Sequence, residues 1–319
     1  MISSVNEITP QYADNFIYQY FNISAPISPY NELIAYEYLW SIPGSSLKNI
    51  SMQFSSRNTS ILPSTILAEE YNYLINDEFI MQKKEIQDFI DQKIKNPPYF
   101  SILLKENPQY PDKLLDTKYL VNLLYYRGNP DLANKKCISV VGTRNISNDG
   151  VRRTKQIVRE LAKRDVVIVS GLARGTDTIA LHEAIHQKCP VVGVIGTPID
   201  EYYPKENRAL QELIATEYLL FSQVPFFKYK NQPYETKKIY FVERDITMAA
   251  LSDATIIIEA SDTSGTLKQA RACIEQGRKL FILNSCFEQP DIKWPAMYEK
   301  KGAIRVRTLN DIFDNIEGL

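Results

Sequence analysis

From Cys137 onward, short apolar runs rich in β-branched residues alternate with amphipathic stretches of roughly ten to fifteen residues. We expect strands at Cys137–Val141, Val166–Val169, Val191–Ile195, Tyr218–Ser222, Thr255–Ile258, Leu280–Leu283 and Ala303–Val306. We expect helices at Gly150–Ala162, Thr178–Gln187, Glu206–Ala215, Glu243–Leu251, Thr266–Gln276, Ile292–Lys300 and Leu309–Ile316. Strands that are apolar almost throughout are typical of a parallel sheet with helices on both faces. The pattern therefore predicts an α/β fold with a doubly wound, mainly parallel sheet.

Residues 1–95 differ from the rest of the chain in glycine content and in the spacing of apolar residues. They contain a single glycine, Gly44, and show helix-like apolar spacing around Tyr30–Leu39 and Ile66–Ile94. Pro97 and Pro98 end the last of these helices, because proline lacks an N–H donor and disfavours helix in the residue before it. We expect a small helical N-terminal domain over 1–95. The second domain is expected to span 96–319, with 96–135 as a connector containing short helical and strand pieces.

The composition is that of a globular protein without bulk attraction to polyanions. Of the 319 residues, 44% are apolar and 24% are charged, and 37 lysines and arginines face 38 acidic residues. Any anion-binding site must therefore be a local patch. No apolar run approaches the roughly 20 residues that cross a bilayer. The four cysteines form no CxxC pair, so we expect buried thiols in a cytoplasmic protein rather than a zinc site or disulfides.

One strand-to-helix loop carries an unusual string, Ser170–Asp177, with two glycines and an arginine. In a doubly wound sheet, ligands bind beyond the carboxyl ends of the strands. The start of the following helix offers free N–H groups and a positive dipole end, which suits a phosphate. Gly171 and Gly175 allow a ligand to approach the backbone closely, and Arg174 can donate hydrogen bonds to two phosphate oxygens. The alternative is a simple bend in which the glycines only let the chain turn.

Two more loops follow strands and have the same character. The first contains Gly142 and Arg144 and lacks the GxGxxG spacing of an ordinary NAD site. The second, Asp262–Lys268, places Ser264 and Gly265 at the start of a helix, where they suit an anion or merely cap the helix. Because the carboxyl ends of parallel strands share one edge of the sheet, the three loops together predict a phosphate-binding surface.

These strings resemble a known family. Val140–Arg144, Ser170–Asp177 with His182, Tyr203–Arg208, Ser264–Leu267 and Glu275–Arg278 occur in the order seen in DprA/Smf DNA-processing proteins, and the resemblance covers roughly residues 100 to 317. It implies a Rossmann-like domain that binds single-stranded DNA in a positively charged pocket and forms a homodimer, with no cofactor. In the better-known members this activity serves the loading of the recombinase RecA during natural transformation. Whether this chain serves transformation, recombination or defence stays open.

The resemblance also gives the candidate site. The DNA- or phosphate-binding candidates are Gly142, Arg144, Ser170, Gly171, Arg174, Gly175, Arg208, Arg244, Ser264, Gly265 and, less directly, Lys268. Where the family typically has Asn and a second Arg after the position of Arg244, this chain has Asp245 and Ile246, which removes one positive charge and adds a negative one. The loop 284–286 reads Asn-Ser-Cys instead of the family's Pro-Gly.

Two enzymatic alternatives compete with a purely binding role. His182–His186 spells HExxH, the zinc-peptidase string, but it lies directly after the glycine loop of an α/β frame, which argues against zinc. Nucleotide chemistry of the phosphoribohydrolase or defence-sensor kind would use Glu259 on a ribose or water. Otherwise Glu259 pairs with Arg144 or Arg174.

The segment 225–230 either stacks unpaired bases or packs as a connector. We expect a non-enzymatic nucleic-acid-binding protein.

Overall fold

The computed structural model describes residues 27–56, 61–71 and 77–316. Within them, nine strands form one sheet in the order β1-β2-β6-β5-β4-β3-β7-β8-β9. The strands are β1 (Ser101–Leu104), β2 (Leu123–Gly128), β3 (Cys137–Val141), β4 (Val167–Ser170), β5 (Val191–Ile195), β6 (Leu219–Ser222), β7 (Ala254–Ile257), β8 (Lys279–Leu283) and β9 (Ile304–Val306). From β6 to β9 all neighbours are parallel. The predicted doubly wound, mainly parallel sheet is confirmed.

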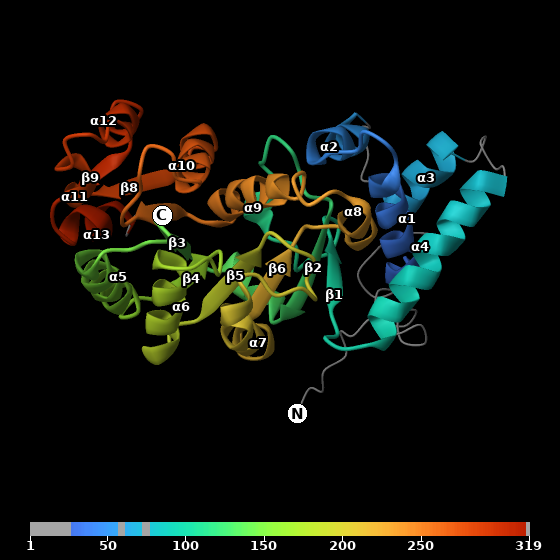
Figure 1. Cartoon of the computed structure of the whole chain (residues 1–319), viewed down its shortest axis with the longest axis horizontal. Helices are drawn as coiled ribbons and strands as arrows, with labels where there is room; N and C mark the ends of the chain where they lie inside the picture. The colour runs from blue at the N-terminus through green and yellow to red at the C-terminus, as the bar shows by residue number, and fades with distance from the viewer. Residues whose placement is uncertain (1–26, 57–60, 72–76, 317–319) are drawn as a thin grey trace.

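Helices cover both faces of this sheet. The helices of the described residues are α1 (Pro29–Ser41), α2 (Leu47–Ser55), α3 (Pro63–Tyr71), α4 (Asp77–Lys95), α5 (Asn148–Leu161), α6 (Thr176–His186), α7 (Arg208–Glu217), α8 (Phe226–Asn231), α9 (Lys238–Leu251), α10 (Thr266–Glu275), α11 (Asn284–Phe287), α12 (Trp294–Glu299) and α13 (Asn310–Ile316), of which α1 to α4 lie beyond the β1 edge of the sheet (Figure 1). Figure 1 shows α5, α6 and α7 on one side of the sheet and α9, α10 and α12 on the other. Burial on both faces explains why the strands are apolar throughout.

The winding of the chain reverses between β3 and β7. From β3 the chain adds β4, β5 and β6 on one side, and it then returns to place β7, β8 and β9 on the other. This pair of strands is the topological switch point, where loops diverge and leave room for a ligand. The loops after β3 (Cys137–Val141), β4 and β7 all start at this edge.

The segment 96–135 does more than connect. Its strands β1 and β2 join the edge of the sheet as antiparallel neighbours, with Tyr126 opposite Phe221 of β6. Between them lies a short 3₁₀ turn, Asp112–Leu114, and a second, Pro130–Asn134, leads into β3. One continuous hydrophobic core runs from Ile27 to Ile316, so the division into 1–95 and 96–319 stays a prediction.

A buried carboxylate attaches the N-terminal helices to the sheet. Glu37 of α1 is fully buried and accepts hydrogen bonds from the Tyr125 hydroxyl at 2.6 Å and from the N–H groups of Phe226 and Phe227 at 2.9 Å. Burial raises the pKa of Glu37 to about 7, against the lowering by these three donors. One side chain thus caps α8 and ties α1 to β2.

The aromatic segment 225–230 forms α8 and packs into the core. The rings of Phe226 and Tyr125 lie 5.0 Å apart, and those of Phe226 and Phe100 also lie 5.0 Å apart. Phe226 is 2% and Phe227 6% exposed, so neither ring is open to a base. The connector interpretation is correct for these two residues. None of the helices in the described part of the chain is long and apolar enough to cross a membrane.

All four cysteines, Cys137, Cys189, Cys273 and Cys286, are buried and free, as the sequence predicts.

Candidate functional site

Direct hydrogen bonds join the three predicted loops into one surface. Thr143 donates its N–H to the Glu259 carbonyl at 2.7 Å, which links the loops after β3 and β7. Thr176 donates its N–H and its hydroxyl to the Thr143 carbonyl, each at 3.2 Å. The Thr266 hydroxyl donates to the Gly142 carbonyl at 3.1 Å. The prediction that these loops meet at one sheet edge is therefore confirmed.

Contacts within the protein explain the two glycines of the 170–177 loop. Gly175 has φ +74°, and a Cβ there would lie 2.4 Å from the Thr143 carbonyl oxygen. A Cβ on Gly171 would lie 1.3 Å from Nη1 of Arg244, because that guanidinium rests directly on the Gly171 backbone. Both positions need the close approach that the sequence indicated. The partner is the protein itself and not a ligand.

A carboxylate already occupies the corner where a phosphate was expected. Asp177, 5% exposed, accepts the Gly171 N–H at 3.1 Å, so this donor is not free for an external anion. Burial raises the pKa of Asp177 to about 6, while Arg244 and the N–H groups of Gly171 and Ala173 act in the opposite direction. The glycine loop is thus built around an internal anion.

Several of the predicted phosphate-binding residues do not line a hollow described below. Ser170 is fully buried and donates its hydroxyl to the Val140 carbonyl at 2.9 Å, which corrects the expectation that it serves a ligand. Arg208 is exposed but stacks over the Tyr202 ring, 4.8 Å from its centroid. Lys268 is exposed on α10. Neither Arg208 nor Lys268 lines a hollow described below.

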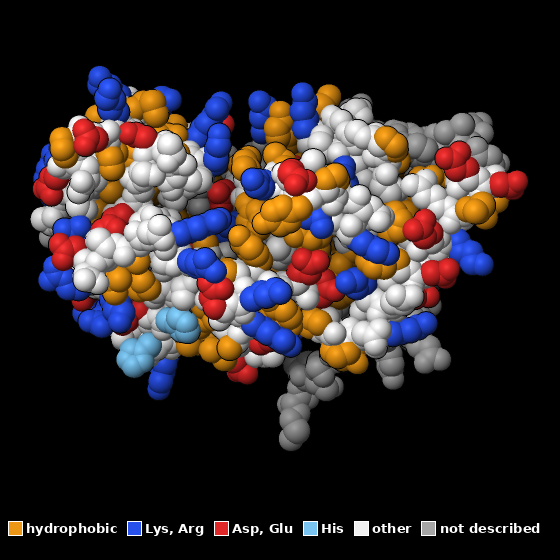
Figure 2. Space-filling view, in the orientation of Figure 1, with side chains coloured by type: hydrophobic (Ala, Val, Ile, Leu, Met, Phe, Trp, Pro, Cys, Tyr) orange, Lys and Arg blue, Asp and Glu red, His pale blue; other side chains and the backbone are white. Residues whose placement is uncertain are grey.

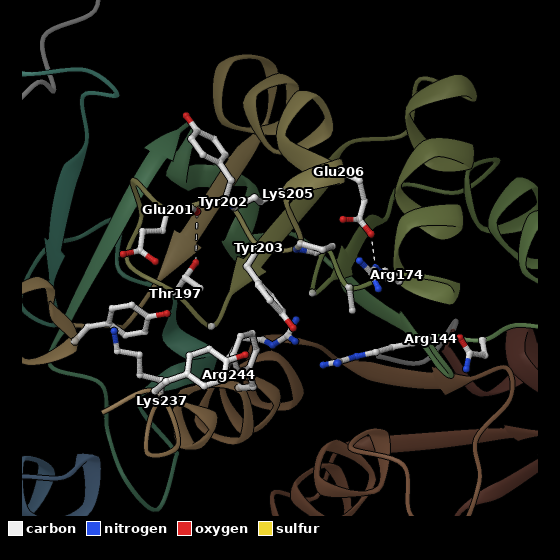
Figure 3. A pocket seen from close by; sticks show the side chains of 18 residues that line it. Arg144, Arg174, Thr197, Glu201, Tyr202, Tyr203, Lys205, Glu206, Lys237 and Arg244 are labelled. Carbon is white, nitrogen blue, oxygen red and sulfur yellow. Dashed lines mark hydrogen bonds and ion pairs between the residues drawn. The ribbon is translucent and has the colours of Figure 1, made fainter. Parts of the chain in front are cut away.

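A large open hollow, here called the arginine–tyrosine hollow, lies beside these loops. Its volume is about 720 Å³. Its charged lining consists of Arg144, Arg174, Lys205, Lys237, Arg244, Glu201 and Glu206, and its aromatic lining of Tyr202, Tyr203, Tyr229, Tyr234 and Phe241. Figure 3 shows Arg144, Arg244 and Tyr203 pointing toward one another across it. Five cations against two carboxylates make the hollow a local positive patch on a chain of nearly zero net charge.

Not all of this charge is available to a ligand. Arg174 forms an ion pair with Glu206, which lowers the pKa of that carboxyl, and Arg244 pairs with Asp245 at 3.2 Å. Within the described part of the chain, Arg144 and Lys205 form no ion pair, and Lys237 lies 4.2 Å above the Tyr229 ring. Arg144, Lys205 and Lys237 are therefore the cations best placed to meet an anion.

Exposed aromatic rings lie beside these cations. Tyr203 is 43% and Tyr234 71% exposed, and the Tyr203 and Phe241 rings lie 5.2 Å apart at a tilt. Figure 2 shows lysines and arginines next to hydrophobic side chains near the middle of this face. Lys205, Lys237 and these rings were not among the site residues predicted from the sequence. Two of them, Tyr203 and Lys205, lie in the string Tyr203–Arg208, which is one of the strings that carry the family resemblance.

Comparison with known proteins assigns the family. The family model described as DNA recombination-mediator protein A matches residues 101–317. The chain belongs to this family.

Its relatives include the DNA processing protein DprA of Streptococcus pneumoniae, 34% identical over 218 residues, which are 68% of this chain and 70% of that protein. The X-ray structure of DprA from the same species superposes with a TM-score of 0.65 at 27% identity, over 89% of this chain and 92% of that one. DNA processing protein A from Helicobacter pylori, a structure described for its unique single-stranded DNA binding mode, gives a TM-score of 0.58 at 26% identity, over 69% of this chain and 96% of that chain.

This DprA-family chain has a second, smaller hollow at the switch point. Its volume is about 400 Å³, and it brings Arg144 and Arg244 together with Asp177 and Asp245, so its formal charge balances. Burial raises the pKa of Asp245, while Arg244 and Arg144 lower it. Ser264 and Gly265 line this hollow too, and the Ser264 hydroxyl accepts the Thr266 N–H at 3.3 Å; the N-cap of α10 is Gly265, so the alternative that a Ser264 side chain caps this helix is wrong.

The second departure from the family pattern, Ile246, is half-buried and packs against the core, so this position no longer offers a charge to the surface.

The residues of the enzymatic alternatives have other partners. Glu259 accepts the N–H of Ser147 at 3.0 Å and its hydroxyl at 2.5 Å, so the predicted pairing with Arg144 or Arg174 is wrong. Glu183 of the HExxH string accepts from Arg159 at 2.7 Å, and His182 and His186 are exposed. In the described residues no group of three or more His, Cys, Asp or Glu side chains is placed to hold a metal ion.

Proposed function

We propose that this protein is a DNA-processing protein that binds single-stranded DNA in the arginine–tyrosine hollow, as a recombination mediator of the DprA family. The observation that carries the proposal is one open hollow of about 720 Å³ that joins uncommitted cations to exposed aromatic rings. Cations that follow a phosphate backbone and rings on which bases stack are the two parts of single-strand recognition.

The two parts of the hollow have separate roles in this proposal. Arg144, Lys205 and Lys237 bind phosphates, a contribution that falls as salt rises. Tyr203 and Tyr234 offer faces to unpaired bases, each stacked base contributing about 1–3 kcal/mol. Bases inside a duplex cannot reach these rings, so we expect single strands to bind more tightly than duplexes.

The role we propose is binding and not catalysis. The carboxylates best placed for nucleotide chemistry are already engaged, Asp177 by the Gly171 N–H and Glu259 by Ser147. From the family resemblance we further propose that the protein acts as a homodimer and that a RecA-type recombinase is its client.

The test removes charge inside and outside the hollow. Binding of a labelled oligo-dT of about 20 nucleotides, longer than one typical single-strand site, is followed by fluorescence anisotropy at several salt concentrations. Arg144→Ala/Lys237→Ala is expected to weaken binding by about tenfold or more and to reduce the salt slope by about 1.4, since each lost phosphate contact on a single strand removes about 0.7. The matched control is Arg271→Ala/Lys163→Ala, which removes two charges, 70% and 66% exposed, outside both hollows.

The proposal requires the control to lose less than about twofold, because exposed charges farther away act only through screened electrostatics. Equal losses in both double variants would show that binding is not located in the hollow. Tight binding of dTMP without any response to the oligonucleotide would instead favour the nucleotide-processing alternative.

A further inference from the structure

A third hollow lies at the carboxyl ends of β8 and β9, where α5 and the start of α13 meet; we call it the β8–β9 hollow. Its volume is about 440 Å³, and its polar lining includes Arg153, Gln156, Ser285, Arg307 and Thr308. We propose that the β8–β9 hollow is a second phosphate-binding site, occupied by a downstream phosphate of the strand that the arginine–tyrosine hollow holds. The source of the phosphate rests on the proposed function, whereas the site rests on its own residues.

The position of this hollow fits a continuing strand. Strands β3, β7, β8 and β9 are parallel neighbours, so their carboxyl ends lie along one edge of the sheet. Arg144, at the near end of the arginine–tyrosine hollow, follows β3, and three steps of about 4.8 Å separate β3 from β9, which places the two hollows on the order of 15 Å apart. An extended single strand covers that distance in a few nucleotides.

The two arginines have weak ties to the protein's own carboxylates. Arg153 has one ion pair, at 3.8 Å to Asp149, near the limit of such contacts. Arg307 forms no ion pair with any residue that the structure describes, and nearby Asp311 uses its carboxylate on the N–H groups of Arg307 and Thr308, at 2.8 and 2.7 Å. Both guanidiniums are thus available for charge-assisted hydrogen bonds to a phosphate.

A buried hydroxyl shares this hollow with Arg153. Arg153 of α5 and Ser285 of α11 both line the hollow and so face the same space. The hydroxyl of Ser285 is buried and has no hydrogen-bond partner among the described residues. A buried hydroxyl without a partner is costly, and a phosphate oxygen would accept from it.

The acidic side chain at this hollow is held by a neighbour. Glu288 accepts the Asn284 amide N–H at 2.5 Å, and Asn284 in turn accepts from Arg305 at 2.7 Å. Two arginines against one carboxylate leave the hollow positive. Ser285 supplies the buried hydroxyl of this site, and it stands in the loop where the family pattern described above has Pro-Gly.

The experiment compares two lengths of oligo-dT, about 4 and about 20 nucleotides, because a strand of about 4 that occupies the arginine–tyrosine hollow leaves too little chain to reach the β8–β9 hollow. Arg153→Ala/Arg307→Ala is expected to weaken the long oligonucleotide about tenfold and to leave the short one within about twofold. Ser285→Ala, which changes no charge, is expected to weaken the long oligonucleotide about threefold through a lost charge-assisted hydrogen bond. The matched control, Arg271→Ala/Lys163→Ala, removes charges that are 70% and 66% exposed outside the hollow, and it should preserve the difference between the two lengths.

Equal losses for both lengths, or none for either, would overturn the proposal. A second arm identifies the source of the phosphate: inorganic pyrophosphate is titrated by calorimetry into the wild type and into Arg153→Ala/Arg307→Ala. Pyrophosphate binding that depends on these arginines, with no length effect, would overturn the strand path in favour of a free phosphate. If the wild type binds neither oligonucleotide, the proposed function has failed, and the pyrophosphate arm alone decides on the site.

Discussion

At the scale of single residues, the protein's own side chains shape the glycine-rich loop between β4 and α6. Arg244 lies where a side chain on Gly171 would be, and Asp177 takes up the Gly171 N–H. The sequence predicted that both glycines allow a close approach. It could not predict which group approaches, because Arg244 is distant in the chain and reaches Gly171 only through packing of α9 against the sheet.

The first prediction concerns this contact. Gly171→Ala is expected to lower the free energy of unfolding by about 1–3 kcal/mol, because the new methyl group must displace the Arg244 guanidinium. The matched control is Gly265→Ala, where φ is −57° and no atom lies within 4 Å of the new Cβ; it should change stability by less than about 0.5 kcal/mol. Urea denaturation measures both, and equal effects would contradict this explanation of Gly171.

At the scale of elements, α8 and α11 were not predicted, whereas the seven strands and seven helices predicted from residue 137 onward are present, most with bounds within two residues. Their apolar periodicity is local, so β3 and β5 have the predicted bounds. The antiparallel strands β1 and β2 were expected only as pieces of a connector, because two short apolar runs do not show which sheet they join. Contacts between distant elements decided the position of α8, whose rings pack against β2.

The second prediction concerns Glu37, which joins α1, β2 and α8. Burial raises its pKa from an ordinary 4.5 to about 7 in the folded protein. Its favourable contribution is therefore complete below pH 4.5 and is lost as the pH rises through 7. This one group is expected to lower the free energy of unfolding by about 3 kcal/mol between pH 4.5 and pH 8, from 1.36 kcal/mol per pKa unit.

Urea denaturation of wild type and Glu37→Gln at pH 5 and pH 8 isolates this contribution. The decrease should be smaller in the variant by about 3 kcal/mol, because its amide does not titrate in this range, while Asp177 and Glu243, whose pKa values burial also raises, still contribute their part. Glu275→Gln, at a side chain that is 60% exposed, should keep the wild-type pH dependence. The same pH dependence in wild type and Glu37→Gln would exclude the carboxylate as its source.

At the scale of the whole molecule, one edge of the sheet collects side chains from loops far apart in the sequence. The sequence predicted this gathering for Gly142, Arg144 and Ser264, because parallel strands end on one side. The sequence did not predict the aromatic lining of the arginine–tyrosine hollow. Tyr203 and Tyr234 belong to separate loops without a shared pattern, and only the folded chain brings them together.

The most direct test of the central claim is to map the residues that a bound single strand contacts. An oligonucleotide carrying 5-iodouracil is cross-linked by light to the wild type, and the joined peptides are identified by mass spectrometry. We predict cross-links at Tyr203, Tyr234 or Phe241, because uncommitted cations and exposed rings meet there. Efficient cross-links found only outside the arginine–tyrosine hollow would contradict the account.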